Sequence, residues 1–220
     1  MSRFVSDFSK IPQQENAEGR LDAPSFHRNH EPIWSAIGRW LNAQDGNAVE
    51  IGSGTGQHIV QFARKAAGLT WWPTDIIEAH LRSIAAWSTE AALANLRPPQ
   101  ILDLTDPAWR PAGIEGGLTA LICINVLHIA PWAVSQNLLG GAGRLLQPGG
   151  RLFIYGPFMR DGAHTAPSNA EFDASLRAKD PDWGVRDIAA LSALAEQSGL
   201  SSVDVTPMPS NNFVLSATRT

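Results

Sequence analysis

The sequence predicts an α/β fold with a mostly parallel sheet, and three observations support this prediction. Short apolar segments alternate with segments of helical period between residues 48 and 155, as in parallel βαβ units. Residues 118–126 form an almost continuous apolar run, which is typical of a strand buried on both faces of a parallel sheet. The connection at residues 207–211 is too short for a helical crossover, so the last strand is expected to be antiparallel.

The first half of the chain is expected to begin with an irregular arm, residues 1–29, in which proline and glycine interrupt any period. A helix is expected from Pro32 to about Ala43, because proline suits a first helical turn and apolar residues then recur every three or four positions. The next expected elements are a strand at 48–51, a glycine loop at 52–56, a helix that restarts near residue 59, a strand at 69–75, a helix at 77–96 and a strand at 99–104.

The second half continues the alternation and then departs from it. Residues 159–186 have no clean period and contain several glycines and prolines, so we expect a functional, lid-like insertion. We therefore predict an arm at 1–29 and a single domain at 30–220 that carries this insertion. The other expected elements are strands at 118–126 and 151–155, helices at 133–146 and 187–198, and two final strands at 202–206 and 212–218.

Composition excludes several classes of function. The chain has 220 residues, 44% hydrophobic and 17% charged, against a usual charged share of about 25%. Such a chain can build a large apolar core and is expected to be one globular domain. Its formal net charge is −4, which offers no electrostatic attraction to nucleic acid or to anionic membranes.

Cysteine and histidine usage point away from a secreted or metal-binding protein. Cys123 is the single cysteine, and it is expected to be a small buried apolar residue. His27 and His30 have no cluster of acids or cysteines nearby in the sequence, so no metal is expected. No apolar stretch approaches the roughly 20 residues that span a bilayer, and Met1–Gln14 lacks the apolar core of a signal peptide. We therefore expect a cytoplasmic protein without a membrane partner.

The glycine loop is the strongest local signal of a ligand site. Its sequence is Glu50-Ile51-Gly52-Ser53-Gly54-Thr55-Gly56, between an expected strand and an expected helix. Such a loop lets the backbone approach a ligand, and the following helix N-terminus suits a carboxylate or a phosphate. By itself the motif is weak evidence, and a tight strand-to-helix turn without a ligand is the alternative. Gln57, at the third glycine position of the dinucleotide fingerprint, and the acidic Glu50 both disfavour NAD.

Two acids are expected near this loop. Asp75 ends the second strand and Asp103 ends the third, so both should lie at the carboxyl edge, where open α/β sheets bind ligands. An acid about 20 residues beyond the glycines can accept both hydroxyls of a ribose. Asp103 is placed where an adenine amino group would lie.

With these residues the sequence resembles class I S-adenosylmethionine-dependent methyltransferases, whose first motif is an acid, any residue, and then Gly-x-Gly-x-Gly. The resemblance implies a Rossmann-like fold, a mostly parallel seven-stranded sheet with an antiparallel last strand and helices on both faces. It implies S-adenosylmethionine as the cofactor. The expected cofactor-binding residues are Glu50, Gly52, Ser53, Gly54, Gly56, Asp75, Asp103, Asn125 and Arg28.

A closer resemblance covers nearly the whole chain. The strings at residues 23–25, 28–29, 123–132, 155–158 and 183–187 are similar to an uncharacterised methyltransferase-like family found in bacteria and animals. This family implies binding of S-adenosylmethionine and supplies no settled methyl acceptor.

The acceptor side is expected after the fourth and fifth strands. His128 is a candidate general base, with a structural edge histidine as the alternative, and Tyr155 is a candidate for orienting the substrate or for packing. Within the insertion, we expect substrate contacts from Asn169 and Arg177. Trp132, which follows His128-Ile129-Ala130-Pro131, is expected to line the substrate pocket.

The predicted function is therefore methyl transfer from S-adenosylmethionine to a small molecule. Two alternatives stay open: a non-catalytic module that binds the same cofactor, and a nicotinamide-dependent oxidoreductase. Turnover to S-adenosylhomocysteine (SAH) tests the first alternative, and the mass of a co-purified ligand tests the second.

Overall fold

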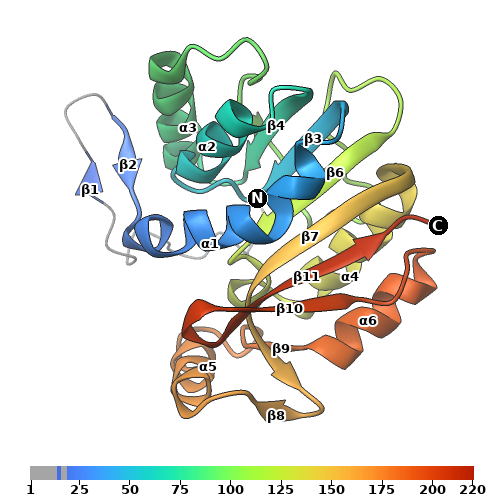
Figure 1. Ribbon diagram of the computed structural model, residues 1–220. Helices are drawn as coiled ribbons and strands as arrows, with labels where there is room; N and C mark the ends of the chain where they lie inside the picture. Colours follow the sequence, from blue (N-terminus) through green and yellow to red (C-terminus); the bar gives the residue numbers. More distant parts are fainter. Residues whose placement is uncertain (1–13, 16–18) are drawn as a thin grey trace. The chain divides into compact units, whose positions relative to one another are not determined.

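The computed structural model describes residues 14–15 and 19–220 of the chain (Figure 1). The chain divides into two compact units. Among the described residues, the first unit comprises 14–15, 19–103 and 111–114, and the second comprises 104–110 and 115–220. None of the helices in the described part has the length and apolarity that crossing a bilayer requires.

The first unit is built around parallel strands. β3 pairs with β4, and β4 pairs with β5, each in parallel, while β1 and β2 form a separate antiparallel pair. The register places Glu50 beside Pro73, so the carboxyl ends of β3 and β4 meet. The elements are β1 (Gln14–Glu15), β2 (Leu21–Asp22), α1 (Pro24–Leu41), β3 (Gly46–Ile51), α2 (Gln57–Lys65), β4 (Leu69–Asp75), α3 (Glu78–Ala91) and β5 (Gln100–Ile101).

Helix α1 corrects one prediction. It begins at Pro24, eight residues before Pro32, which lies inside the helix. Residues 24–29 are therefore helical rather than irregular, whereas residues 1–13 and 16–18 of the expected arm lie outside the described residues. Tertiary contacts explain the difference: Phe26 is buried, and the amide oxygen of Asn29 lies 2.9 Å from Nε2 of His58 on α2. Packing of this kind overrides a local proline signal.

The second unit contains the remaining strands. β6 and β7 are parallel, β11 runs antiparallel to β7, and β10 pairs antiparallel with β11. The elements are β6 (Leu118–Ile124), the short 3₁₀ helix η2 (Leu127–Ile129), α4 (Trp132–Leu145), β7 (Leu146–Arg160), β8 (Ala163–His164), α5 (Pro167–Lys179), β9 (Arg186–Asp187), α6 (Ile188–Gln197), β10 (Asp204–Met208), η3 (Pro209–Asn211) and β11 (Asn212–Thr218).

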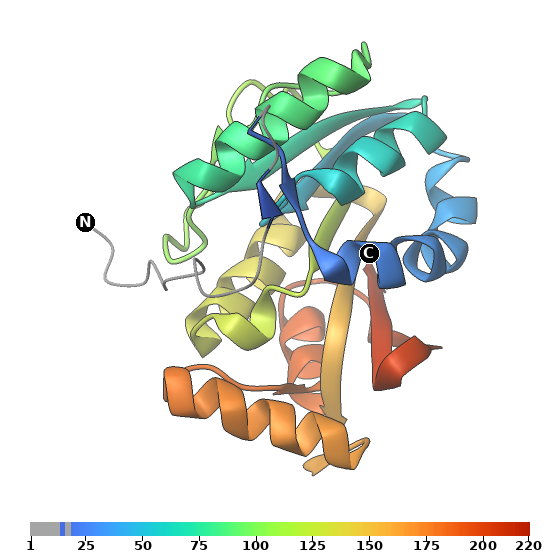
Figure 2. The same cartoon turned by 90° about the vertical axis from the view of Figure 1, so that its left-hand side faces the viewer.

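These strands confirm the predicted fold class, a mostly parallel seven-stranded α/β sheet whose last strand is antiparallel. β6 is buried along its whole length, as the apolar run at 118–126 predicted. β7 is longer than predicted and extends beyond its partner β11 to pair with β8, which Figures 1 and 2 both show.

The insertion at 159–186 is more regular than its sequence indicated. It contains the 13-residue helix α5, together with β8. The helical period is weak because the buried face of α5 contains a single apolar residue, Leu176, beside the polar Asn169 and Asp173. A helix that buries mostly polar groups leaves little trace in the hydrophobic pattern.

Candidate functional site

The glycine loop follows β3 and depends on left-handed backbone angles. Gly52, Gly54 and Gly56 have φ angles of +64°, +57° and +90°. These angles are readily adopted by glycine and are strained for residues that carry a Cβ atom. The main-chain N–H of Ser53 donates to the carbonyl of Thr74 at 2.8 Å, which fixes the loop to the end of β4.

Gly54 and Gly56 serve different purposes in this loop. A Cβ atom at Gly56 would lie 2.9 Å from the Cα atom of Ile84, so this glycine permits close packing against α3. A Cβ atom at Gly54 would meet no other atom of the described chain within 4 Å. The loop is therefore packed at Gly56 and open at Gly54, and the open position is where a ligand can approach the backbone.

Asp75 lies beside the loop, as the sequence predicted. Its Oδ2 atom accepts a hydrogen bond from the main-chain N–H of Gly54 at 2.8 Å, and its Oδ1 atom accepts one from Ile77 at 2.9 Å. The side chain is only 6% exposed, so Asp75 is buried at the end of β4. Asp75 is therefore both a candidate ligand contact and a support of the loop.

Sequence reasoning missed His80, in the first turn of α3. Its Nδ1 atom lies 3.2 Å from Oδ2 of Asp75, and its side chain is buried. The available signal was a histidine five residues after an acid that ends a strand, and this spacing alone does not identify a site. His80 adds a third polar neighbour to the Asp75 carboxylate and helps to orient it.

Glu50 is fully buried at the end of β3. Its Oε2 atom has no hydrogen-bond partner within the described residues. Burial raises the pKa of Glu50 to about 8, with a smaller contribution from the negative charge of Asp75 and an opposing one from a hydrogen bond with Ser53. Glu50 is therefore mainly protonated at neutral pH, and it presents a polar atom without a partner beside the loop.

We expect the Glu50→Gln variant to change the pH dependence of stability. The folded-state pKa of about 8 lies above the ordinary value of 4.5, so the folded state binds more protons between these pH values. The free energy of unfolding of the wild type should fall as pH rises through this window. Glutamine resembles the neutral form, so the variant should lose less stability, with a difference on the order of a few kcal/mol by pH 8. Urea denaturation at pH 5 and pH 8 measures this difference, and parallel profiles would contradict it.

The remaining candidates of the first unit occupy its strand ends and α1. Asp103 is half-buried and follows β5, where the N–H of Leu102 donates to the carbonyl of Asp75 at 3.1 Å. Ile76 and Ile101 are exposed at 38% and 74%, and Ile101 is the register partner of Asp75. Sequence reasoning missed this exposed apolar surface, whose signal was an isoleucine directly after a strand-ending acid. Arg28 lies on α1 and is exposed.

In the second unit, the side chains of Asn125 and His128 lie beside Gly156 of β7. Asn125 has a φ of +58°, and its main-chain N–H donates to the carbonyl of the buried Tyr155 at 2.9 Å. A Cβ atom at Gly156 would lie 3.5 Å from Nδ1 of His128 and 3.7 Å from Oδ1 of Asn125. The glycine after Tyr155 thus leaves room for both polar side chains.

His128 is more buried than its predicted role assumed. Burial lowers the pKa of His128 to about 4, with a smaller contribution from the positive charge of Arg186. The ring packs edge-on against Phe172 of α5, with centroids 5.4 Å apart. At neutral pH the imidazole is therefore uncharged and a weaker base than an exposed histidine.

Arg186 holds the turn that carries His128. Its Nε–H donates to the carbonyl of Leu127 at 3.1 Å, and an Nη2–H of the same guanidinium donates to the carbonyl of Ala130. The guanidinium carbon lies 5.8 Å from the ring centroid of Trp132. Arg186 thus contacts both Trp132 and the 3₁₀ turn. A guanidinium suits this role because it carries several N–H donors in a fixed geometry.

Asn169 and Arg177 make contacts within the second unit. The Asn169 amide donates to the carbonyl of Asn211 at 2.9 Å and to the hydroxyl of Thr165 at 3.1 Å. The Nε–H of Arg177 donates to Asp173 at 2.9 Å, which helps to lower the pKa of this carboxyl. These bonds fix α5, and a substrate role for either residue stays a prediction.

The structure brings together the predicted loop residues and Asp75 in the first unit, and Asn125, His128 and Tyr155 in the second. The first group combines an open backbone position at Gly54, a buried oxygen on Glu50 without a hydrogen-bond partner among the described residues, and two exposed isoleucines, Ile76 and Ile101. Among the residues of the described ranges, no group of three or more His, Cys, Asp or Glu side chains is arranged to hold a metal ion.

The chain is similar to solved structures of methyltransferases. The S-adenosylmethionine-dependent methyltransferase SibL matches with a TM-score of 0.71 and 19% identity, over 89% of this chain and 55% of that chain. An O-methyltransferase family protein from Burkholderia thailandensis matches with a TM-score of 0.71 and 17% identity, over 89% and 57%. Magnesium protoporphyrin IX methyltransferase from Synechocystis PCC 6803, solved with bound SAH, matches with a TM-score of 0.64 and 16% identity, over 88% and 83%.

These similarities confirm the Rossmann-like methyltransferase fold. This chain spans about half the length of the first two structures. A family model described as "Protein of unknown function (DUF938)" matches residues 20–219.

Proposed function

This chain belongs to the family described as "Protein of unknown function (DUF938)", and from this premise and its fold we propose that it is an S-adenosylmethionine-dependent methyltransferase that acts on a small molecule. The observation that carries the proposal is the glycine loop. Its backbone is open at Gly54, and Asp75 holds the N–H of the same residue.

Each part of the cofactor has a candidate partner in the first unit. Asp75 has two carboxylate oxygens with room for further hydrogen bonds, and we assign it to the ribose hydroxyls. The exposed Ile76 and Ile101 offer an apolar surface to a flat purine ring, and Asp103 is a candidate acceptor for its amino group. Glu50, with its unpartnered oxygen, is a candidate for the amino-acid end together with the free N–H groups at the start of α2.

The bound cofactor would supply a methyl group on a positively charged sulfur, which is already a good leaving group. The protein then has to align the acceptor atom with the sulfur–carbon bond and exclude water.

The second unit provides the candidate residues for the acceptor. We propose that the neutral His128 accepts a proton where the acceptor must lose one, and that Tyr155 and Trp132 orient the acceptor. Asn125 remains a candidate cofactor contact, and Arg28 a candidate partner of a carboxylate. Asn169 and Arg177 are proposed to act on the acceptor through the position of α5, since their hydrogen bonds fix this helix.

Thermal stabilisation tests the proposal directly. At 100 times its dissociation constant, SAH should add about 2.7 kcal/mol, or about 5 to 10 °C in melting temperature for a chain of this size. NAD at the same concentration is the control and should give no shift. A larger shift with NAD, or none with SAH at millimolar concentration, would refute the assignment.

A second measurement separates a methyltransferase from a binding module. The protein is incubated with methyl-labelled S-adenosylmethionine and a metabolite extract, and SAH production is followed. Transfer of the label to a small molecule supports the proposal, whereas binding without turnover across the extract favours a non-catalytic module.

A further inference from the structure

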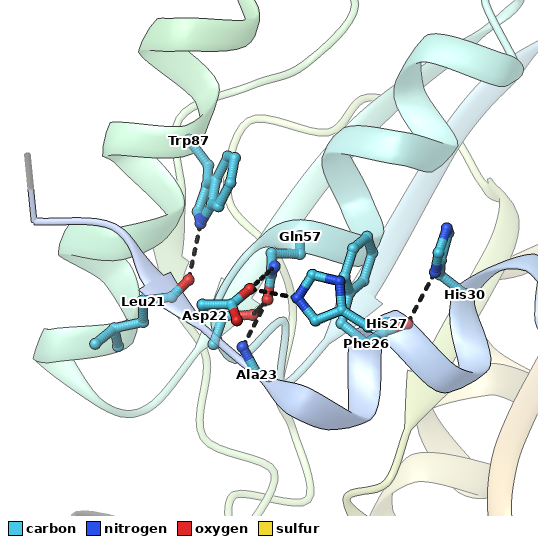
Figure 3. A network of polar contacts seen from close by, with 9 residues as sticks. Leu21, Asp22, Ala23, Phe26, His27, His30, Gln57 and Trp87 are labelled. Atoms are coloured by element: carbon cyan, nitrogen blue, oxygen red, sulfur yellow. Dashed lines mark hydrogen bonds and ion pairs between the residues drawn. The ribbon is translucent and has the colours of Figure 1, made fainter. Parts of the chain in front are cut away.

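Residues 21–23, which we call the clasp segment, are bound to the glycine loop through a side chain that the proposed function leaves unused. Gln57 is the first residue of α2 and is only 4% exposed. Its Oε1 atom accepts hydrogen bonds from the N–H of Ala23 at 2.9 Å and from the hydroxyl of Thr55 at 2.8 Å. Its Nε2 group donates to Oδ1 of Asp22 at 2.5 Å, and Figure 3 shows these groups pointing toward one another.

Helix α3 binds the same segment at Leu21. The main-chain N–H of Leu21 donates to the hydroxyl oxygen of Ser83 at 2.8 Å, and its carbonyl accepts from Nε1 of Trp87 at 3.0 Å, the latter visible in Figure 3. Ser83 is fully buried and donates in turn to the carbonyl of Thr55 at 2.8 Å. Both main-chain polar groups of Leu21 are therefore satisfied by α3.

Thr55 is the point where these bonds converge. It stands between Gly54 and Gly56, its hydroxyl donates to Gln57, and its carbonyl accepts from Ser83. Thr55 is only 5% exposed, whereas the Cβ position of its neighbour Gly54 is open. The loop is thus held at Thr55 through Gln57 and Ser83, which also bind the clasp segment, whereas the Cβ position of Gly54 faces open space.

We propose that Asp22, Gln57 and Ser83 are positioning residues that couple the order of the clasp segment to the binding of the nucleoside cofactor. Gln57 links the clasp segment to Thr55. The neighbouring loop residue, Gly54, donates its main-chain N–H to Asp75. A loop held in its binding conformation avoids the entropic cost of ordering when the ligand arrives. This inference rests on the proposed function, because it assumes that the ligand of the loop is that cofactor.

Coupling between two parts of a protein is reciprocal, so it can be measured from both ends. If the clasp segment strengthens cofactor binding, then cofactor binding must also stabilise the clasp segment by the same factor. The N–H groups of Leu21 and Ala23 report on the segment, since each donates to a side chain named above.

The experiment measures SAH affinity by calorimetry for the full-length wild type, Asp22→Ala, Gln57→Ala and a matched control. Asp22→Ala removes the acceptor of the Gln57 amide and also the 2.8 Å contact of Asp22 with Nε2 of His27, at a half-exposed position. Gln57→Ala removes three hydrogen bonds. The control is Glu31→Gln, which weakens an ion pair of 2.8 Å between Glu31 on α1 and Lys65 on α2. This ion pair also joins α1 to α2, but it involves no residue of the glycine loop.

We expect the SAH dissociation constant to rise about 10-fold in Asp22→Ala and further in Gln57→Ala, with the control within about 2-fold of wild type. Hydrogen exchange at Leu21 and Ala23 should slow when SAH is added to the wild type or the control. A purely structural role would change stability and leave this ligand-dependent exchange unaffected.

Wild-type affinity in both folded variants, with no effect of SAH on exchange at Leu21 and Ala23, would overturn the inference and leave the proposed function standing. Failure of the wild type itself to bind SAH would remove the proposed function, and the inference with it. If Gln57→Ala does not fold, Asp22→Ala decides the question.

Discussion

Asp75→Ala is expected to weaken SAH binding about 10- to 150-fold. A hydrogen bond to a charged group contributes about 1.5 to 3 kcal/mol, and the proposed bonds to the ribose hydroxyls would be lost. The substitution also removes the acceptor of the Gly54 N–H and leaves His80 without its carboxylate neighbour. Isothermal calorimetry on the purified variant measures the change in affinity.

Two further variants separate the causes of this loss. Asp75→Asn keeps one acceptor oxygen but removes the charge, so its affinity should lie between those of wild type and Asp75→Ala. Glu78→Gln removes a carboxylate three residues away that is 85% exposed and pairs with Arg82, and it should leave affinity unchanged. Unchanged affinity in Asp75→Ala would exclude Asp75 from the cofactor site.

Gly54→Ala is expected to weaken SAH binding by about 10- to 100-fold while the protein stays folded. The new Cβ atom meets no protein atom within 4 Å, so it would project into the space assigned to the ligand. Overpacking by one methyl group typically costs about 1 to 3 kcal/mol. The φ of +57° adds a backbone strain of about 1 to 2 kcal/mol to the free energy of folding. Calorimetry and urea denaturation measure the two effects separately.

Gly116→Ala is the matched control for backbone strain. Gly116 has a φ of +76°, and a Cβ atom there also meets nothing within 4 Å in the described chain. It should lose a similar amount of stability and retain wild-type affinity for SAH. Equal affinities in the two glycine variants would show that the space beside Gly54 is not used by the ligand.

The sequence predicted the parts of the fold that depend on local pattern. β4 at residues 69–75 and β11 at residues 212–218 were predicted with the bounds that the structure shows, because buried apolar residues and turn residues delimit them. The antiparallel direction of β11 followed from the short connection before it. Helix boundaries were less accurate, and α1 was placed too late because Asn29 and Phe26 are ordered by contacts with distant residues.

The candidate site shows the same division. The proximity of the glycine loop to Asp75 was predicted, since the carboxyl ends of adjacent parallel strands meet. The burial of individual side chains was not predicted. The pKa of Glu50 is raised and that of His128 is lowered because the folded chain surrounds both side chains. The role of Gln57 depends on Asp22, 35 residues away, and that of His80 on Asp75, 5 residues away, and no local sequence pattern predicts these pairs.

The contrast between Gly54 and Gly56 has an evolutionary consequence. Gly56 is constrained by the backbone of α3 itself, so a descendant of this protein that abandoned its ligand would still need glycine there to fold. Gly54 is constrained by its φ and by the space in front of it, and asparagine or aspartate tolerate that φ. In a lineage where position 56 stays glycine while position 54 drifts to asparagine or aspartate, the fold has been retained after selection for the ligand has ended.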